Sequence, residues 1–192
     1  MVKRINTAVI SLICNIVFAS YHLIAGTITG SWWLLTLGIY YLLLSVVRIV
    51  ALAFRSKERF ITRFTGWMLM ILSIPLAGTV ILSVLEDRGH VLHMIVMIAM
   101  AAYAFTQITL ATINLIKSRR TKSAYQITLR SISFAEAFVS IFALQRSMLV
   151  SFEGMTDTEI MIMNAVFGSA VCVIVLLIGI NLAFNKKAEY HQ

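Results

Sequence analysis

The sequence predicts an all-α, polytopic membrane protein with six transmembrane helices. Of its 192 residues, 60% are hydrophobic and 12% are charged, whereas about 25% of the residues in a soluble domain are charged. Six apolar runs reach the roughly 20 residues that a helix needs to cross the hydrocarbon core of a bilayer. They cover about residues 5–25, 32–54, 64–85, 91–116, 127–150 and 160–184. We therefore expect residues 1–192 to form a single transmembrane domain.

The charged residues are sorted between the two ends of these spans. Most Lys and Arg residues precede the first span, follow the last, or lie in the second and fourth connections, and most acidic residues lie in the opposite connections. This positive-inside pattern predicts that both termini are cytoplasmic, with the protein in the plasma membrane. The net charge of +8 then reflects orientation and contact with anionic lipids, and we expect no nucleic-acid partner.

The first two spans are joined by a short, glycine-containing link at 26–31, which predicts a tight antiparallel hairpin. Asn15 lies near the middle of the first span, where Asn usually bonds to another helix; lining a transport path is the alternative. His22 lies near the outer end of that span and is expected to be an interfacial anchor. Tyr40 and Tyr41 fall near mid-membrane, either packed with one hydrogen bond or binding an acidic residue or a substrate.

The third span contains the only proline, Pro75, which predicts a kink. Gln107 lies near the middle of the fourth span and is a candidate partner for an acidic side chain at that depth. His90 and His93 precede this span and could ligate a metal. They lack a recognised ligand pattern, so we predict no metal site and no cofactor.

The fifth span is the least apolar and carries Glu136 near mid-membrane. Spacings of three and four residues place Arg130, Ser133, Glu136 and Ser140 on one helix face. An acidic group at this depth costs about 2.5–3.5 kcal/mol on insertion scales, so this face must turn toward protein or water. We expect no Lys or Arg at the depth of Glu136, and hence no ion pair. The sixth span is the most uniformly apolar, and the sequence from Thr156 to Glu159 predicts a capping box at its start.

Two segments of the chain resemble the six-helix membrane domain of the cation diffusion facilitator family of metal/proton antiporters. The first is Asn15 in the first span together with the Gly26–Gly30–Ser31 link. The second is the basic fourth connection, the mid-membrane Glu136 and Asp157 before the last span. The resemblance implies the six-helix scaffold and a homodimer, although the chain ends eight residues after Phe184, without the family's cytoplasmic C-terminal domain.

The metal ligands of that family are mostly replaced. By the register of the link, its two ligand pairs fall on Tyr40 and Leu44 in the second span, and on Ile132 and Glu136 in the fifth. Only Glu136 can ligate a metal well, whereas zinc requires three or four nitrogen, sulfur or oxygen ligands. The resemblance therefore implies a relative that keeps the scaffold and has lost the metal site.

Two functions are consistent with these features. The first is a small transporter, with proton-coupled cation transport through a site of Glu136, Tyr40, Tyr41, Gln107 and Asn15. The second is a non-transporting regulatory or assembly partner in which Glu136 links helices. We do not expect an enzyme, because no nucleophile–base pair or metal set occurs at one depth. The expected surroundings are a lipid bilayer and a small cation or proton.

Overall fold

Six α-helices make up the computed structural model of the chain, which describes residues 2–85, 94–118, 123–151 and 155–184. The helices are α1 (Val2–Thr29), α2 (Trp32–Ala53), α3 (Glu58–Leu85), α4 (Met94–Ser118), α5 (Ala124–Ser151) and α6 (Asp157–Ala183). All six predicted spans correspond to helices. Most helices extend a few residues beyond the predicted apolar run, because a helix can continue into the interfacial region.

Five of these helices are long and apolar enough to cross a membrane. They are α1, α2, α3, α5 and α6, while α4 contributes a shorter apolar stretch, Met97–Ile113, among the described residues. Large aliphatic and aromatic side chains are exposed along the outside of the bundle, including Ile74 at 72% and Val166 at 64%. Such a surface suits lipid, and the chain is a multi-pass membrane protein.

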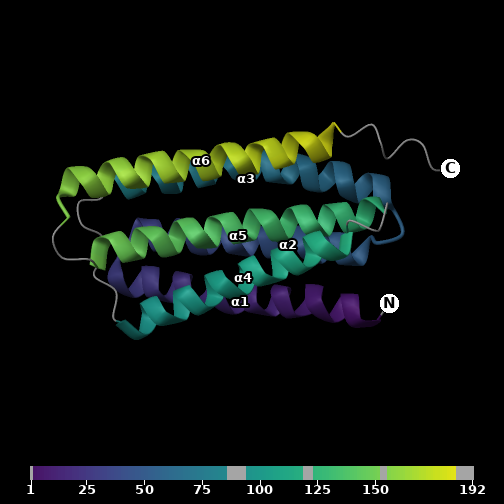
Figure 1. The fold of residues 1–192 in the computed structure, drawn as a ribbon, viewed down its shortest axis with the longest axis horizontal. Helices are drawn as coiled ribbons and strands as arrows, with labels where there is room; N and C mark the ends of the chain where they lie inside the picture. Colours follow the sequence, from purple (N-terminus) through teal and green to yellow (C-terminus); the bar gives the residue numbers. More distant parts are fainter. Residues whose placement is uncertain (1, 86–93, 119–122, 152–154, 185–192) are drawn as a thin grey trace.

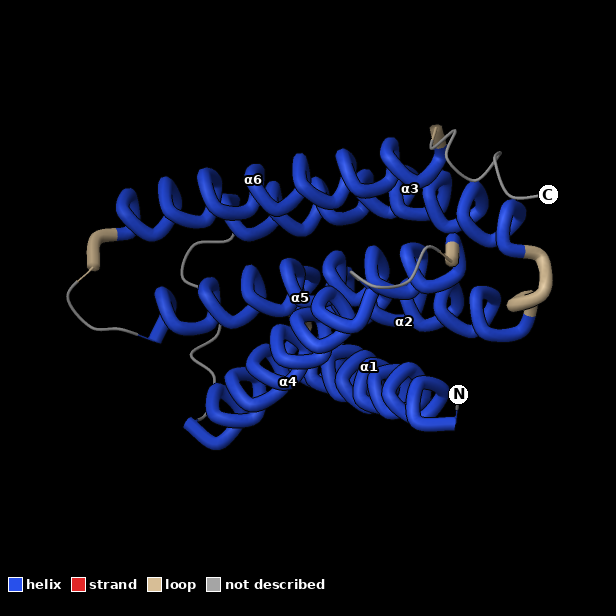
Figure 2. Tube along the Cα trace, turned by 45° about the vertical axis from the view of Figure 1, so that its right-hand side comes forward, coloured by secondary structure: helices blue, strands red, loops and turns tan. Residues whose placement is uncertain are grey.

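The helices are arranged in three layers of two (Figure 1). The pair α3 and α6 forms one outer layer, α2 and α5 form the middle layer, and α1 and α4 form the other outer layer, as Figure 2 also shows. The start of α1 and the end of α6 lie at the same end of the bundle, which we call the terminal end. The opposite end, where α5 ends and α6 begins, we call the distal end.

The helix boundaries follow from local chemistry. Gly30 has a left-handed φ of 67°, which lets the chain leave α1 and start α2 at once. Ser31 caps α2 by accepting a hydrogen bond from the backbone N–H of Leu34. The tight hairpin of α1 and α2 is thereby confirmed. The capping box of Thr156 and Glu159 at the start of α6 is also confirmed.

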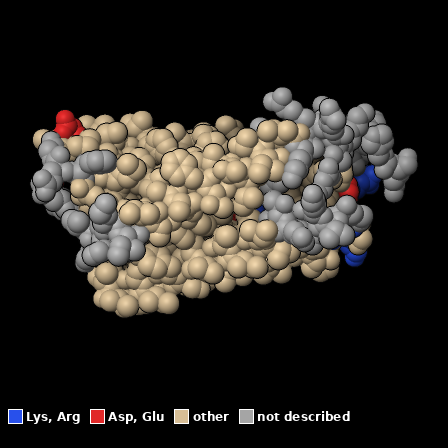
Figure 3. All heavy atoms as spheres, turned by 60° about the horizontal axis from the view of Figure 1, so that its bottom comes forward, with Lys and Arg blue, Asp and Glu red and all other residues tan. Residues whose placement is uncertain are grey.

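The surface shown in Figure 3 is almost uncharged along its broad middle. Lys and Arg side chains are seen at the terminal end together with an acidic side chain, and another acidic side chain is seen at the distal end. The position of the basic side chains agrees with the charge pattern of the sequence. Which end faces the cytoplasm stays a prediction.

Candidate functional site

The inward face of α5 carries the only described acidic side chain that is fully buried. Ser133, Glu136 and Ser140 are at most 2% exposed, so the polar face predicted for this helix does turn into the bundle. Glu136 itself is 0% exposed. A carboxylate in this position needs hydrogen-bond donors or a counter-charge from neighbouring helices.

An arginine supplies the counter-charge. Nη2 of Arg48 lies 2.7 Å from Oε2 of Glu136, and these side chains are 1% and 0% exposed. The same Nη2 donates to Oγ of Ser133 at 3.0 Å. The expectation that Glu136 has no ion-pair partner is therefore wrong.

The direction of helical side chains explains this ion pair. Tyr41 contacts Ser140 and Arg48 contacts Ser133, so α2 and α5 are antiparallel. Side chains of a helix lean toward its N-terminus. Arg48 consequently reaches toward the distal end while Glu136 reaches toward the terminal end, and their head groups meet.

The Arg48–Glu136 pair belongs to a larger set of polar side chains that we call the central network. Its members are Ser11 and Asn15 of α1, Arg48 of α2, Tyr103 and Gln107 of α4, and Ser133 and Glu136 of α5. All are at most 8% exposed. Four helices from the middle layer and one outer layer thus converge on a single buried carboxylate.

Asn15 is the hub of the network. Its Nδ2 donates to Oε1 of Glu136 at 2.5 Å. Its Oδ1 accepts from the hydroxyl of Tyr103 and from Nε2 of Gln107, both at 2.5 Å. The interhelical hydrogen bonding predicted for Asn15 is present.

Gln107 joins the network one step away from the carboxylate. Its Nε2 donates to Asn15 and also to the Tyr103 hydroxyl at 2.9 Å. The hydroxyl of Ser11 lies 3.3 Å from Oε1 of Gln107 and 3.4 Å from Oε2 of Glu136, and its single hydrogen can serve only one of them. The direct contact between Gln107 and Glu136 that we expected is replaced by contacts through Asn15 and Ser11.

The two adjacent tyrosines of α2 have different roles. Both are 0% exposed. The Tyr41 hydroxyl donates to Oγ of Ser140 at 3.2 Å, which matches the interpretation of a packed tyrosine with one hydrogen bond. The Tyr40 hydroxyl has no hydrogen-bond partner among the described residues. Neither phenol hydrogen-bonds to Glu136, which is held by Arg48, Asn15 and Ser11 instead.

His22 is buried rather than interfacial. Its side chain is 0% exposed and packs against Phe18 and Tyr41, with ring centroids at 4.6 and 5.9 Å. Nδ1 lies 2.8 Å from the Phe18 carbonyl, to which it donates. The prediction of an interfacial anchor is wrong, because α2 covers this face of α1.

The site contains no cluster of classical metal ligands. The described residues include no group of three or more His, Cys, Asp or Glu side chains that could hold a metal ion. Cys14 and Cys172 are both free thiols, half-buried in the bundle. His90 and His93 lie outside the described residues.

Ser11, Arg48 and Tyr103 belong to the central network but were not among the predicted site residues, and Ser133 was predicted only to share a helix face with Glu136. Arg48 shares a helix face with Tyr41 and Ser45, and the lean of its long side chain toward mid-membrane was the signal that could have identified it. No known family model matches this sequence, and no curated protein matches it either.

Proposed function

We propose that the protein is a small membrane transporter in which the central network is the transport site and a proton or small cation exchanges at Glu136. The observation that supports this proposal most directly is the fully buried Arg48–Glu136 ion pair, with its 2.7 Å contact. Ionisable groups inside a membrane are expensive and usually functional. A buried ion pair is also seldom needed for stability, since apolar side chains of similar volume often serve as well.

The geometry suggests how exchange would occur. Arg48 occupies the position that a bound cation would take, so a cation must compete with a guanidinium that is tethered to α2. A proton on Glu136 would remove the charge that holds Arg48. The ion pair would then open, and the contacts between α2 and α5 would loosen. Proton binding at one carboxyl is thereby coupled to the packing of the middle layer.

The resemblance to cation diffusion facilitators fits this proposal. The four positions that correspond to that family's ligand pairs, Tyr40, Leu44, Ile132 and Glu136, are all 0% exposed. They lie on α2 and α5, which contact each other in the middle layer. We infer a relative of that scaffold in which the Arg48 guanidinium supplies the positive charge that a metal ion would otherwise bring.

A flux assay in proteoliposomes tests this function. Vesicles that contain the wild type and an internal pH-sensitive dye are given an outward gradient of a small organic cation such as tetramethylammonium. We expect proton uptake that is lost in Glu136→Gln and partly kept in Glu136→Asp, which retains the carboxylate. Ser169→Ala, on the exposed face of α6, should behave as the wild type. Zinc should cause no flux, because three of the four family ligand positions are occupied by side chains that bind zinc poorly.

A non-transporting partner subunit is the second candidate function. The observation that favours it is the saturation of Glu136, whose Oε1 accepts from Asn15 and whose Oε2 contacts Arg48 and Ser11. In this function the network links four helices and holds a surface for another protein. Two results together would favour this function. Vesicles with the wild type would show no more proton flux than empty vesicles, and a membrane protein would co-purify with the wild type and not with Glu136→Gln. Light scattering on the same preparation would measure the implied homodimer.

A further inference from the structure

The outside of α3 carries a cation followed by a row of apolar side chains. Spacings of four, four and three residues place Arg63, Trp67, Ile71 and Ile74 on one side of this helix, which we call the outer α3 face. Arg63 is exposed, and Trp67, Ile71 and Ile74 are 52%, 52% and 72% exposed. Because Arg63 directly precedes the apolar run predicted over residues 64–85, we place its guanidinium at the level of the lipid headgroups.

Aromatic rings border the outer α3 face toward α2 and toward α6. The Phe60 and Phe64 rings stack with their centroids 5.8 Å apart, and the ring of Phe54, at the end of α2, lies 6.0 Å from that of Phe60. The Trp67 ring lies 6.3 Å from the ring of Phe184, at the end of α6. Trp is enriched where a membrane meets water, so this part of α3 lies where headgroups and acyl chains join.

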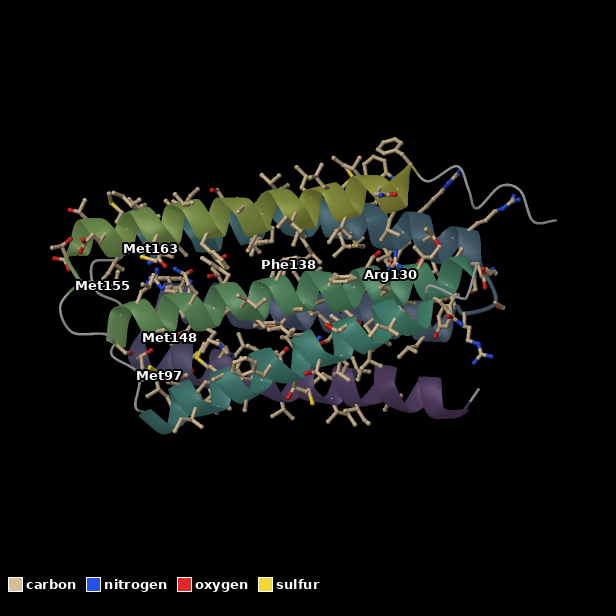
Figure 4. All side chains as sticks on the ribbon, in the orientation of Figure 1. Met97, Arg130, Phe138, Met148, Met155 and Met163 are labelled. Carbon is tan, nitrogen blue, oxygen red and sulfur yellow. The ribbon has the colours of Figure 1, made fainter. Side chains whose placement is uncertain are left out.

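Charged and apolar surfaces are separated along the outside of the bundle. Figure 3 shows Lys and Arg side chains at the terminal end and a broad surface without charge next to it. In Figure 4, the side chains that project outward from the middle of the α3–α6 layer consist almost entirely of carbon. A lipid lying along α3 would therefore meet cations at one level and hydrocarbon at the next.

The acidic residue nearest to these cations is turned away from them. Glu58 is the only described acidic residue at the terminal end. Its Oε1 accepts a hydrogen bond from the Ser123 hydroxyl at 2.8 Å, and its Oε2 accepts one from the backbone N–H of Ala124 at 3.1 Å. The carboxylate thus points toward the start of α5 in the middle layer. The exposed side chains of Lys57 and Arg63 consequently keep the outside of α3 positive at this end.

We propose that the outer α3 face binds an anionic phospholipid. The Arg63 guanidinium donates to the phosphate oxygens, which its planar fork matches, and Lys57 adds positive charge at the headgroups. One acyl chain lies along Trp67, Ile71 and Ile74. A free phosphate would use only the cations, and a zwitterionic lipid would bring a positive group of its own toward them. This face lies outside the bundle, so the proposal is independent of transport at Glu136.

Quenching of Trp67 by brominated lipids tests this proposal, because bromine quenches tryptophan only at close range. Trp32→Phe leaves Trp67 as the only well-exposed indole, since Trp33 is 4% exposed. This full-length variant is reconstituted in phosphatidylcholine that contains increasing fractions of brominated phosphatidylglycerol or brominated phosphatidylcholine. At low salt, we expect the phosphatidylglycerol to quench at a mole fraction at least about fivefold lower, the factor for one basic side chain near headgroups. High salt should reduce this preference.

Variants and a second reporter locate the site. Arg63→Gln should lower the preference about fivefold, whereas Arg63→Lys, which keeps the charge, should largely retain it. Lys57→Gln should lower it less, and this variant serves if Arg63→Gln does not fold. Trp67→Phe is the matched control, because it leaves Trp32, 68% exposed at the distal end, as the reporter. There, the two brominated lipids should quench equally.

Three results would overturn the proposal. Equal quenching of Trp67 by the two brominated lipids would mean that the outer α3 face does not select anionic lipid. An unchanged preference in a folded Arg63→Gln would mean that Arg63 does not hold the headgroup. An equal preference at Trp32 and Trp67 would mean that the whole protein surface attracts anionic lipid and that α3 carries no site.

Discussion

Arg48 and Glu136 form one ion pair but differ in whether each can become neutral when its partner is removed. A buried carboxyl that loses its partner can take up a proton and become neutral, whereas a guanidinium stays charged in a protein. Each side chain of this pair is almost fully buried. The two single substitutions are therefore expected to have unequal effects.

Glu136→Gln leaves the Arg48 guanidinium buried without a counter-charge and should cost about 3–5 kcal/mol of unfolding free energy. Arg48→Met should cost less, because Glu136 can then be protonated. The double variant should be more stable than Glu136→Gln alone. Thermal unfolding in detergent, followed by tryptophan fluorescence, measures this order. A larger loss in Arg48→Met than in Glu136→Gln would contradict it.

The Tyr103 hydroxyl offers a more local measurement. Tyr103→Phe removes its contacts with Asn15 and Gln107 but keeps the ring, which stacks on Phe18 at 3.7 Å. We expect a loss of about 0.6–2 kcal/mol, the value of a hydrogen bond between membrane helices. Tyr125→Phe, at the half-buried start of α5, is the matched control and should change little. Equal unfolding midpoints for both variants would argue against a network that stabilises the bundle.

At the scale of the elements, α3 and α6 approach each other unusually closely through glycine. A methyl group added to Gly66 would lie within 2.4 Å of the Ala183 backbone nitrogen, and one added to Gly179 would meet Met70 and the Gly66 carbonyl. Small residues allow membrane helices to associate by backbone contact where no hydrophobic force drives them together. This contact makes α3 and α6 a distinct layer.

Two alanine substitutions on α3 test this layer with opposite expected signs. Gly66→Ala should destabilise the protein by about 1–3 kcal/mol because the helices must separate. Gly78→Ala meets nothing within 4 Å and should stabilise it by about 0.5–1 kcal/mol through helix propensity. Unfolding midpoints in one detergent give both signs. A neutral Gly66→Ala would show that the close contact contributes nothing.

At the scale of the whole molecule, the central network lies between the middle layer and the layer of α1 and α4. The apolar runs predicted the six helices, because the length of a membrane span and its hydrophobicity are properties of the local sequence. The inward face of Glu136 and the bonding of Asn15 could also be predicted, since helix periodicity assigns residues to faces. The Arg48–Glu136 contact and the burial of His22 could not, because both depend on which helices become neighbours and how far side chains reach between them.

The orientation of the whole molecule in the membrane is open to a direct test. In a variant with Cys14→Ser and Cys172→Ser, single cysteines replace Ser56, between α2 and α3, or Thr158, at the start of α6; both positions are exposed. The positive-inside pattern predicts that an impermeant thiol reagent labels Thr158→Cys in intact cells, and Ser56→Cys only after permeabilisation. The reverse labelling would invert the topology.

The distance along the chain between Arg48 and its partners also constrains biogenesis. Ser133, the nearer partner, lies 85 residues after Arg48. During synthesis α2 must therefore enter the bilayer before any residue of α5 exists. Until then Arg48, close to the end of α2, can only extend toward the headgroups. The Arg48–Glu136 ion pair can form only after α5 has inserted, so its formation would report assembly of the bundle. A chain truncated before Glu136 would leave Arg48 without this partner and would expose its charge to membrane quality control.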